Sequence, residues 1–201
     1  MSTHPSDIAF TPAVKAQQER LGSRHIYENI RGAGWDTTIT EKRAAFIRER
    51  DSFYLATTSA DGYPYIQHRG GSKGVLRVLD EKRLAFADYP GNKQYISIGN
   101  LDENNRVCLF LMDYPNRSRL KIWGRAQYVE GDAELEAQVA DPAIKAKIER
   151  VFVVTVDVMD GNCPKFIAPR FTEEEMGDSI EALKARIREL EEQVKGCAPD
   201  A

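Results

Sequence analysis

SFYLATTSADGYPYIQHRGG, residues 52–71, contains two candidate strands and the turn that joins them. The segment 52–59 is rich in aromatic and β-branched residues, which favour strands. Ala60-Asp61-Gly62 follows, and Asp-Gly is typical of a tight hairpin turn. The segment 63–69 then returns as the second strand. This stretch therefore predicts an antiparallel hairpin.

Five more segments with strand patterns follow at short spacing. They are 74–79, 83–87, 106–113, 119–129 and 150–158. Short turns between strands favour a closed antiparallel barrel over a parallel sheet with crossover helices. Two helical stretches, 92–104 and 132–148, interrupt the strands. The sequence predicts a mainly β (α+β) fold, an antiparallel barrel of about six to seven strands with peripheral helices.

Both ends of the chain carry helical patterns. Thr11-Pro12 suits a helix start within the first 20 residues, and Thr40 can cap a helix that ends near Asp51. In the tail an apolar residue recurs at spacings of 4, 3, 4, 3 and 4: Met176, Ile180, Leu183, Ile187, Leu190 and Val194. This heptad seam predicts a helix that packs on a partner subunit or on its own barrel. We expect an arm over 1–39, a barrel domain over 40–170 and an amphipathic helix and tail over 171–201.

Composition excludes several classes of protein. The formal net charge is −3 and the pI is about 5.7, so no basic field indicates nucleic acid. No apolar run approaches the roughly 18 residues of a membrane span, and the first residues do not form a secretory signal. The three cysteines and three histidines show no disulfide framework or metal-ligand spacing. We therefore expect a cytoplasmic protein without a metal or a membrane partner.

The end of the second strand carries polar residues suited to a ligand. Side chains alternate along a strand, so Gln67 and Arg69 share one face and His68 points to the other. Gly70-Gly71 then allows close approach of another group to the backbone. This pattern suits a planar polar ligand, and equally an edge strand with solvated side chains.

A second candidate lies where the strand 83–87 ends. Pro90-Gly91 turns the chain, and Asn92, Lys93 and Gln94 are expected to begin a helix. The first N–H groups of a helix are unpaired and carry partial positive charge, which suits a phosphate, and Lys93 adds a full charge. An ordinary capped surface helix would have the same composition.

Two later segments are also candidates. Arg119, Lys121 and Trp123 alternate onto one strand face, which suits an anionic aromatic ligand, a subunit interface or a solvated face. Asn162 and Pro164 have the composition of a turn. Cys163, between them, has no nearby Cys or His and is expected to be a packing thiol rather than a nucleophile.

Together these segments resemble the FMN-binding split barrel family related to pyridoxamine 5′-phosphate oxidase, in particular a bacterial subgroup. The similarity covers about residues 35–170 and is carried by FYLATTSADGYPYIQHRGG, VLRVLDEKRLAFADYPGNKQYISIGNL, RVCLFLMDYPNRSRLKIWGRAQYVE and GNCPKFI. It implies an antiparallel split β-barrel and a homodimer that holds two molecules of flavin mononucleotide (FMN) at its interface.

The resemblance also implies which residues bind the cofactor. The strand at Gln67, His68, Arg69 and Gly70 would run beside the flavin and its phosphate. Asp88 ends the next strand, and Asn92, Lys93 and Gln94 would hold the phosphate. Arg119 and Lys121 would approach the flavin, and Trp123 would form a wall for the ring or the interface. The remaining contacts implied from the C-terminal side are Asn162, Pro164 and Lys165.

The sequence departs from the oxidase proper at its C-terminus. The oxidases carry a Trp followed by an Arg-Leu-x-Pro ending there, whereas this chain has tryptophans only at 35 and 123 and ends in the heptad helix. The resemblance thus implies an FMN-dependent oxidoreductase for an unidentified small molecule, with NADH or NADPH as a candidate donor. The alternatives are a flavin-binding or stress-related module without turnover, a split barrel that uses F420 or haem, and a degenerate barrel that acts as a scaffold.

Overall fold

The computed structural model describes residues 4–28, 35–161 and 164–196. Its strands are β1 (Trp35–Asp36), β2 (Ser52–Thr58), β3 (Pro64–Gly70), β4 (Arg77–Val78), β5 (Arg83–Asp88), β6 (Arg106–Asp113), β7 (Ser118–Val129) and β8 (Arg150–Gly161). Its helices are the 3₁₀ turn η1 (Pro5–Ile8), α1 (Pro12–Arg20), α2 (Arg24–Glu28), α3 (Glu41–Arg48), α4 (Ile96–Glu103), α5 (Ala133–Val139) and α6 (Glu173–Gly196).

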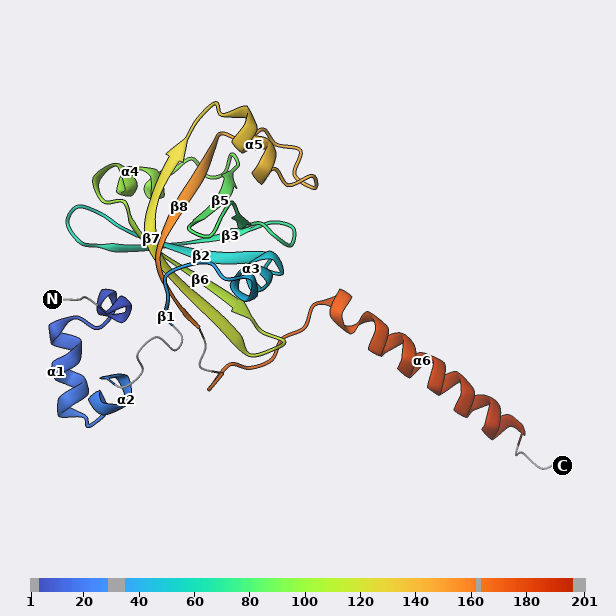
Figure 1. Cartoon of the computed structure of the whole chain (residues 1–201). Coiled ribbons are helices and arrows are strands. Elements are labelled where there is room, and N and C mark those ends of the chain that lie inside the picture. The colour runs from blue at the N-terminus through green and yellow to red at the C-terminus, as the bar shows by residue number, and fades with distance from the viewer. Residues whose placement is uncertain (1–3, 29–34, 162–163, 197–201) are drawn as a thin grey trace.

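The strands form one curled antiparallel sheet (Figure 1). The order is β3-β2-β6-β7-β8-β5-β4, and the short β1 pairs with β8. Within the described chain no backbone pairing joins β3 to β4 or β5, so the sheet is not closed. The closed barrel expected from strand spacing is therefore wrong, and the split barrel implied by the resemblance is confirmed.

The strand predicted over 74–79 shrinks to two residues, Arg77 and Val78. Gly74 has a φ of +81°, a conformation that suits a turn and not a strand. Its N–H donates to the carbonyl of Arg50 at 2.9 Å, which holds the turn against the end of α3. The chain thus crosses from β3 to β4 by a turn before pairing resumes.

The barrel core comes from alternate side chains of the long strands. On β2, β6 and β7 buried residues alternate with more exposed ones, as expected for a sheet with one face inward. Phe53, Phe86 and Phe152 are fully buried, and the rings of Phe86 and Phe152 stack with centroids 4.9 Å apart. A smaller cluster beneath α5 covers the other face of β5 and β8. These two strands are therefore buried on both sides.

Two helices differ from their predicted bounds. The predicted 132–148 helix is α5, which covers only Ala133–Val139, since Pro142 disfavours helix at the residue before it. The predicted 92–104 helix begins at Ile96 instead of Asn92. Lys93 and Tyr95 have φ angles of 57° and 55°, in the left-handed region, so the helix cannot start before Tyr95.

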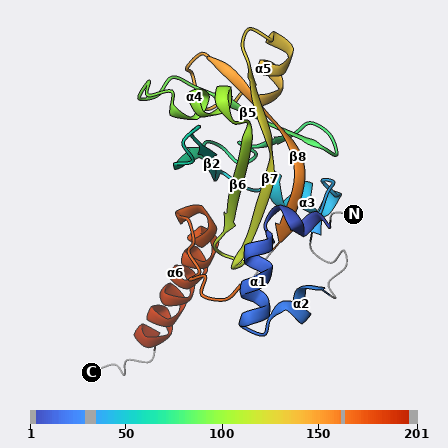
Figure 2. The ribbon, with the colours of Figure 1, turned by 90° about the vertical axis from the view of Figure 1, so that its left-hand side faces the viewer.

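The arm and the tail lie at one end of the sheet, and α4 and α5 lie at the other (Figures 1 and 2). Trp35 of β1 stacks on Trp123 of β7, with ring centroids 5.7 Å apart, and Phe10 meets Trp35 edge to face at 5.2 Å. The arm therefore covers part of the outer face of β7. By contrast, α6 points away from the sheet (Figure 1).

Candidate functional site

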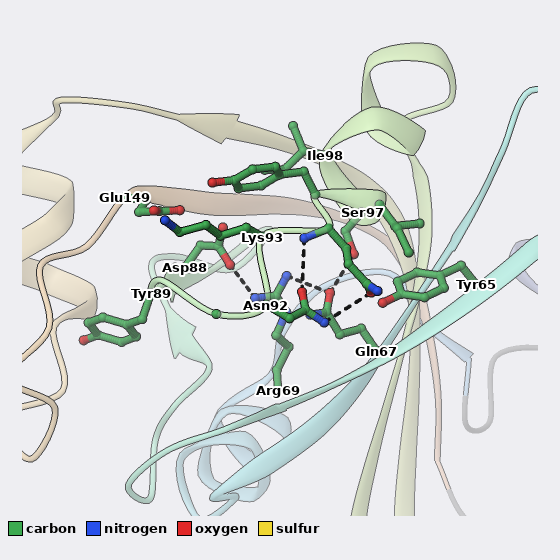
Figure 3. Close-up of a pocket in the computed structure, with 14 residues that line it drawn as sticks. Tyr65, Gln67, Arg69, Asp88, Tyr89, Asn92, Lys93, Ser97, Ile98 and Glu149 are labelled. Carbon is green, nitrogen blue, oxygen red and sulfur yellow. Dashed lines mark hydrogen bonds and ion pairs between the residues drawn. The ribbon is translucent and has the colours of Figure 1, made fainter.

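A pocket lies at the split between β3 and β5, beneath the start of α4 (Figure 3). Its volume is about 220 Å³, which is below the roughly 300–1,000 Å³ of typical ligand pockets. It can therefore hold one end of a cofactor rather than a whole one. Its lining comes from β3, the end of β5, the loop to α4, the first turn of α4 and the residue before β8: Tyr65, Gln67, Arg69, Asp88, Tyr89, Gly91, Asn92, Lys93, Gln94, Tyr95, Ile96, Ser97, Ile98 and Glu149.

Asp88 bridges two arginines across the split. Its carboxylate accepts from Arg69 Nη1 and, through the other oxygen, from Arg150 Nη1, each at 2.5 Å. Asp88 is only 7% exposed, so both ion pairs are shielded from water. Burial acts to lower the pKa of Arg150, but hydrogen bonds to Asp88 and Glu130 outweigh it and hold that pKa above its ordinary value. Through Arg69 the bridge joins β3 to β5, which share no backbone hydrogen bonds, whereas Arg150 lies on β8, the strand paired with β5.

Gln67 connects the same network to α4. Its Oε1 accepts from Arg69 Nη2 at 3.1 Å and from the Ser97 hydroxyl at 2.9 Å. Figure 3 shows these side chains converging below the start of α4. The amide oxygen of Gln67 therefore fixes the position of the Arg69 guanidinium and of the first helical turn relative to each other.

One polar atom of this network has no partner. Arg69 Nε is buried and makes no hydrogen bond within the described residues, although an unpaired buried donor costs about 1–3 kcal/mol. The guanidinium also packs over the rings of Phe86 and Phe152, with Cζ at 5.5 and 5.2 Å from their centroids. An acceptor supplied by a ligand would satisfy the unpaired donor.

The start of α4 offers further donors to the same pocket. Tyr95 stands at its N-cap in a left-handed conformation and makes no side-chain cap hydrogen bond. Uncapped N–H groups at a helix N-terminus favour an anion. Lys93 lies on the pocket rim with an exposed side chain, while Asn92 Oδ1 accepts from the Gln94 N–H at 3.2 Å and shapes the loop. The phosphate-binding features expected at 92–94 thus lie in a strained loop just before the helix.

The predicted residues therefore fall into separate groups. Six of them share the pocket: Gln67, Arg69, Asp88, Asn92, Lys93 and Gln94. His68 faces the other way, as the strand alternation predicted; it is exposed and meets the Tyr54 ring edge to face at 5.6 Å. With Gly70 it lines a neighbouring crevice that also contains Asp141.

The β7 residues lie on the outer face of the sheet, away from the pocket. Lys121 Nζ pairs with Asp160 at 2.8 Å and sits 5.6 Å from the Trp123 ring. Arg119 lies over Phe110 at 6.0 Å. The structure of one chain does not bring these three residues to the pocket lined by Gln67 and Lys93.

The C-terminal candidates that the structure describes are also apart from the pocket. Asn162 and Cys163 lie outside the described residues, and Pro164 and Lys165 are exposed beyond the end of β8. Among the described cysteines, Cys108 is free, and burial raises the pKa of its thiol to about 11. A thiol with that pKa remains protonated at neutral pH and is a poor nucleophile.

Sequence reasoning missed several residues of the site, above all Arg150 and Ser97. Arg150 opens the last predicted strand, and only the pairing of Asp88 with Arg150 across β5 and β8 shows that their charges meet. The sequence did contain one indication of this pair, since Asp88 and Arg150 are opposite charges at the ends of two apolar strand segments. Ser97 gave none, because its role depends on where α4 begins. No group of three or more His, Cys, Asp or Glu side chains suited to a metal occurs among the described residues.

The chain thus has the fold class of an antiparallel split barrel, with a polar pocket at the split that is lined by two cationic side chains, Arg69 and Lys93, and two carboxylates, Asp88 and Glu149. The model of the family described as pyridoxamine 5′-phosphate oxidase matches residues 39–172, about two thirds of the chain. The chain therefore belongs to the pyridoxamine 5′-phosphate oxidase family. A search of curated protein sequences found no match.

Solved structures with similar folds include three bacterial proteins. HupZ of Group A Streptococcus is 17% identical, with 66% of this chain and 99% of that one covered and a TM-score of 0.48. General stress protein 26 of Bacillus anthracis is 16% identical, with 66% and 95% covered and a TM-score of 0.48. An FMN-binding protein of Syntrophomonas wolfei is 12% identical, with 75% and 95% covered and a TM-score of 0.48. Within the described part of this chain, no helix is long and apolar enough to cross a membrane.

Proposed function

We propose that this protein binds FMN and acts as an FMN-dependent oxidoreductase. The proposal rests on one pocket that combines the unpaired Arg69 Nε, the uncapped start of α4 and the Lys93 ammonium. All three favour an anion with several acceptor oxygens, which a terminal phosphate provides. Membership in the family supports a flavin as the carrier of that phosphate.

The pocket residues would divide the work of holding the phosphate. The first N–H groups of α4 and Arg69 Nε would donate to its oxygens, and Lys93 would add charge from the rim. Asp88 offsets part of the positive charge, since it already pairs with Arg69 and Arg150. The site would thus bind through directed donors more than through net charge.

The flavin ring would lie outside this small pocket, and we propose that a homodimer covers it. The outer face of β2, β3 and β6 exposes apolar side chains, with Tyr54 40% and Ile66 64% exposed. Large exposed apolar residues grouped on one face are typical of an interface. A second copy on this face would shelter the ring, and Arg119 and Lys121 on the adjacent β7 would then be the cations nearest to the interface.

The bound flavin would supply the hydride or electron transfer, for which the protein provides binding, orientation and charge. No described side chain is required as a covalent nucleophile, which agrees with the protonated state of Cys108. The substrate would be a small molecule, and NADH or NADPH is the candidate donor. The protein's own task is then to hold the phosphate and exclude water from the ring.

Titration of the purified apoprotein with FMN, riboflavin, F420 and hemin tests the proposal. FMN is expected to bind most tightly, and riboflavin, which lacks the phosphate, at least about tenfold more weakly. Equal affinity for FMN and riboflavin, or preference for F420 or hemin, would overturn the phosphate assignment. A steady-state assay with NADH or NADPH and a panel of acceptors then tests turnover, and FMN binding without turnover in any pairing would leave a flavin-binding module.

A further inference from the structure

The C-terminal helix α6 carries a long apolar seam that has no partner among the residues that the structure describes. Met176, Ile180, Leu183, Ile187 and Leu190 form it, and each is between 38% and 65% exposed. Figure 1 shows the helix pointing away from the sheet, so the barrel of the same chain does not cover the seam. A helix of 24 residues gains most of its stability from packing one face, and this face needs a partner.

The spacing of the seam indicates what kind of partner it suits. The apolar positions repeat every seven residues, which is the a/d pattern of a coiled coil rather than the broader stripe of a helix on a globular core. Ile180 and Ile187 fall at a, and Val194 takes the next a position by sequence. Met176, Leu183 and Leu190 fall at d. β-Branched residues at a with Leu at d favour parallel dimers.

The charges beside the seam fit a second copy of the same helix. Arg186 lies at g and Glu191 at e of the next heptad, the two positions that face each other in a parallel pair. Each Arg186 would therefore meet Glu191 of the second copy, twice over in a symmetric pair. Within the described residues Arg186 forms an ion pair with Glu189 of its own helix, where both side chains are more than half exposed.

We propose that α6 forms a parallel two-stranded coiled coil with α6 of a second copy of this chain. About three heptads are marginal for a free coiled coil in water. The pairing therefore rests on the proposed homodimer of barrels, which would raise the local concentration of the two helices. It does not require flavin. The coiled coil would hold the two subunits together at the end of the barrel opposite to α4.

Disulfide cross-linking of the full-length chain tests this pairing. In a Cys163→Ser/Cys197→Ser background Cys108 can stay, because burial raises the pKa of its thiol to about 11. Leu190→Cys places a thiol at a d position, and Arg188→Cys places one on the outer side of the same turn. Parallel pairing predicts covalent dimers from Leu190→Cys at least about tenfold faster than from the Arg188→Cys control, since a disulfide requires Cα atoms within about 7 Å.

Two results would overturn the inference. One is equal cross-linking of the Leu190→Cys and Arg188→Cys chains. The other is efficient cross-linking in a mixture of Ile180→Cys and Leu190→Cys chains together with little cross-linking of Leu190→Cys alone. That result would indicate antiparallel helices, which bring position 180 next to position 190 of the second copy and separate the two 190 positions by about 15 Å.

A seam variant separates this inference from the proposed function. Leu183→Glu/Leu190→Glu should lower helix content by far-UV circular dichroism while the chain stays dimeric and keeps its flavin. The outward control Ala182→Glu/Ala185→Glu should change none of these. Unchanged helix content in the seam variant would contradict the coiled coil. A wild-type chain that is monomeric and binds no FMN would instead contradict the proposed function.

Discussion

Replacement of Lys93 by Met tests the phosphate site with little effect on the fold. Lys93 lines the pocket with an exposed side chain, and Met keeps the length of the stem but removes the charge. A unit charge pair at about 4 Å is worth about 4 kcal/mol at an effective dielectric of about 20. Solvent exposure reduces such pairs to about 1 kcal/mol, and the near-double charge of a phosphate raises the figure to about 1.5 kcal/mol. The expected loss in FMN affinity is therefore about tenfold.

Fluorescence titration with FMN and with riboflavin measures this loss. Lys93→Met should weaken FMN binding and leave riboflavin binding unchanged, because riboflavin carries no phosphate. Lys42→Met, on an exposed position of α3, is the matched control and should change neither. Added salt should reduce the difference between wild type and Lys93→Met, since exposed charges are screened. An equal loss for both ligands, or none for FMN, would show that Lys93 does not bind the phosphate.

Three further predictions concern the stability of the fold. Asp88→Asn should lower the free energy of unfolding, measured in urea, by about 3–5 kcal/mol, because it breaks two buried ion pairs. The control is Asp80→Asn, which breaks an exposed ion pair and should lower the free energy of unfolding by less than about 1 kcal/mol. Gly124→Ala should cost about 1–3 kcal/mol or more, because its Cβ would lie 2.3 Å from a backbone oxygen, whereas Gly99→Ala meets no atom within 4 Å. Asp141→Asn should destabilise by about 1–3 kcal/mol at neutral pH, and less at lower pH.

The pH dependence at Asp141 follows from its hydrogen bonds. The backbone N–H of Ser72, at 2.6 Å, and that of Ala143, at 2.9 Å, lower the pKa of this carboxyl in the folded state. Its stabilisation is therefore complete above the unfolded pKa of about 3.9 and is lost as the pH falls through the lower folded pKa. Urea unfolding of wild type and Asp141→Asn should converge below about pH 4. A stability difference between wild type and Asp141→Asn that stays constant as the pH falls below about 4 would contradict the role of the Asp141 carboxylate. In the same way, wild-type stability of Asp88→Asn would contradict the buried ion pairs, and wild-type stability of Gly124→Ala would contradict the close backbone contact at residue 124.

The strands of this barrel could be predicted from the sequence, whereas the open split between β3 and β5 could not. Alternation and turn composition placed β2, β3, β6 and β7 within a few residues, because one face of each strand is more buried than the other. The apolar run over 150–158 placed β8, which is buried on both sides. Whether β3 meets β5 depends on sheet curvature and on the Arg69–Asp88 bridge, which link residues far apart in the chain. Local patterns carry no information on such a contact.

The site shows the same limit. Gln67 and Arg69 could be assigned to one face because strand alternation is regular, and Lys93 because of the turn before it. The start of α4 was placed four residues too early, because nothing local reveals that Lys93 and Tyr95 adopt left-handed conformations. Arg150 and Ser97 were missed since only the folded chain brings Arg150 to Asp88 and Ser97 to Gln67.

The absorbance spectrum and mass of the small molecule that co-purifies with the full-length chain would identify the cofactor without any assumption about the substrate. FMN binding at the split predicts a yellow protein with flavin absorbance bands and a released ligand with the mass of FMN. The same preparation of Lys93→Met should carry less of it. A deazaflavin mass or a haem Soret band would contradict the account, and so would a colourless protein that binds no added FMN.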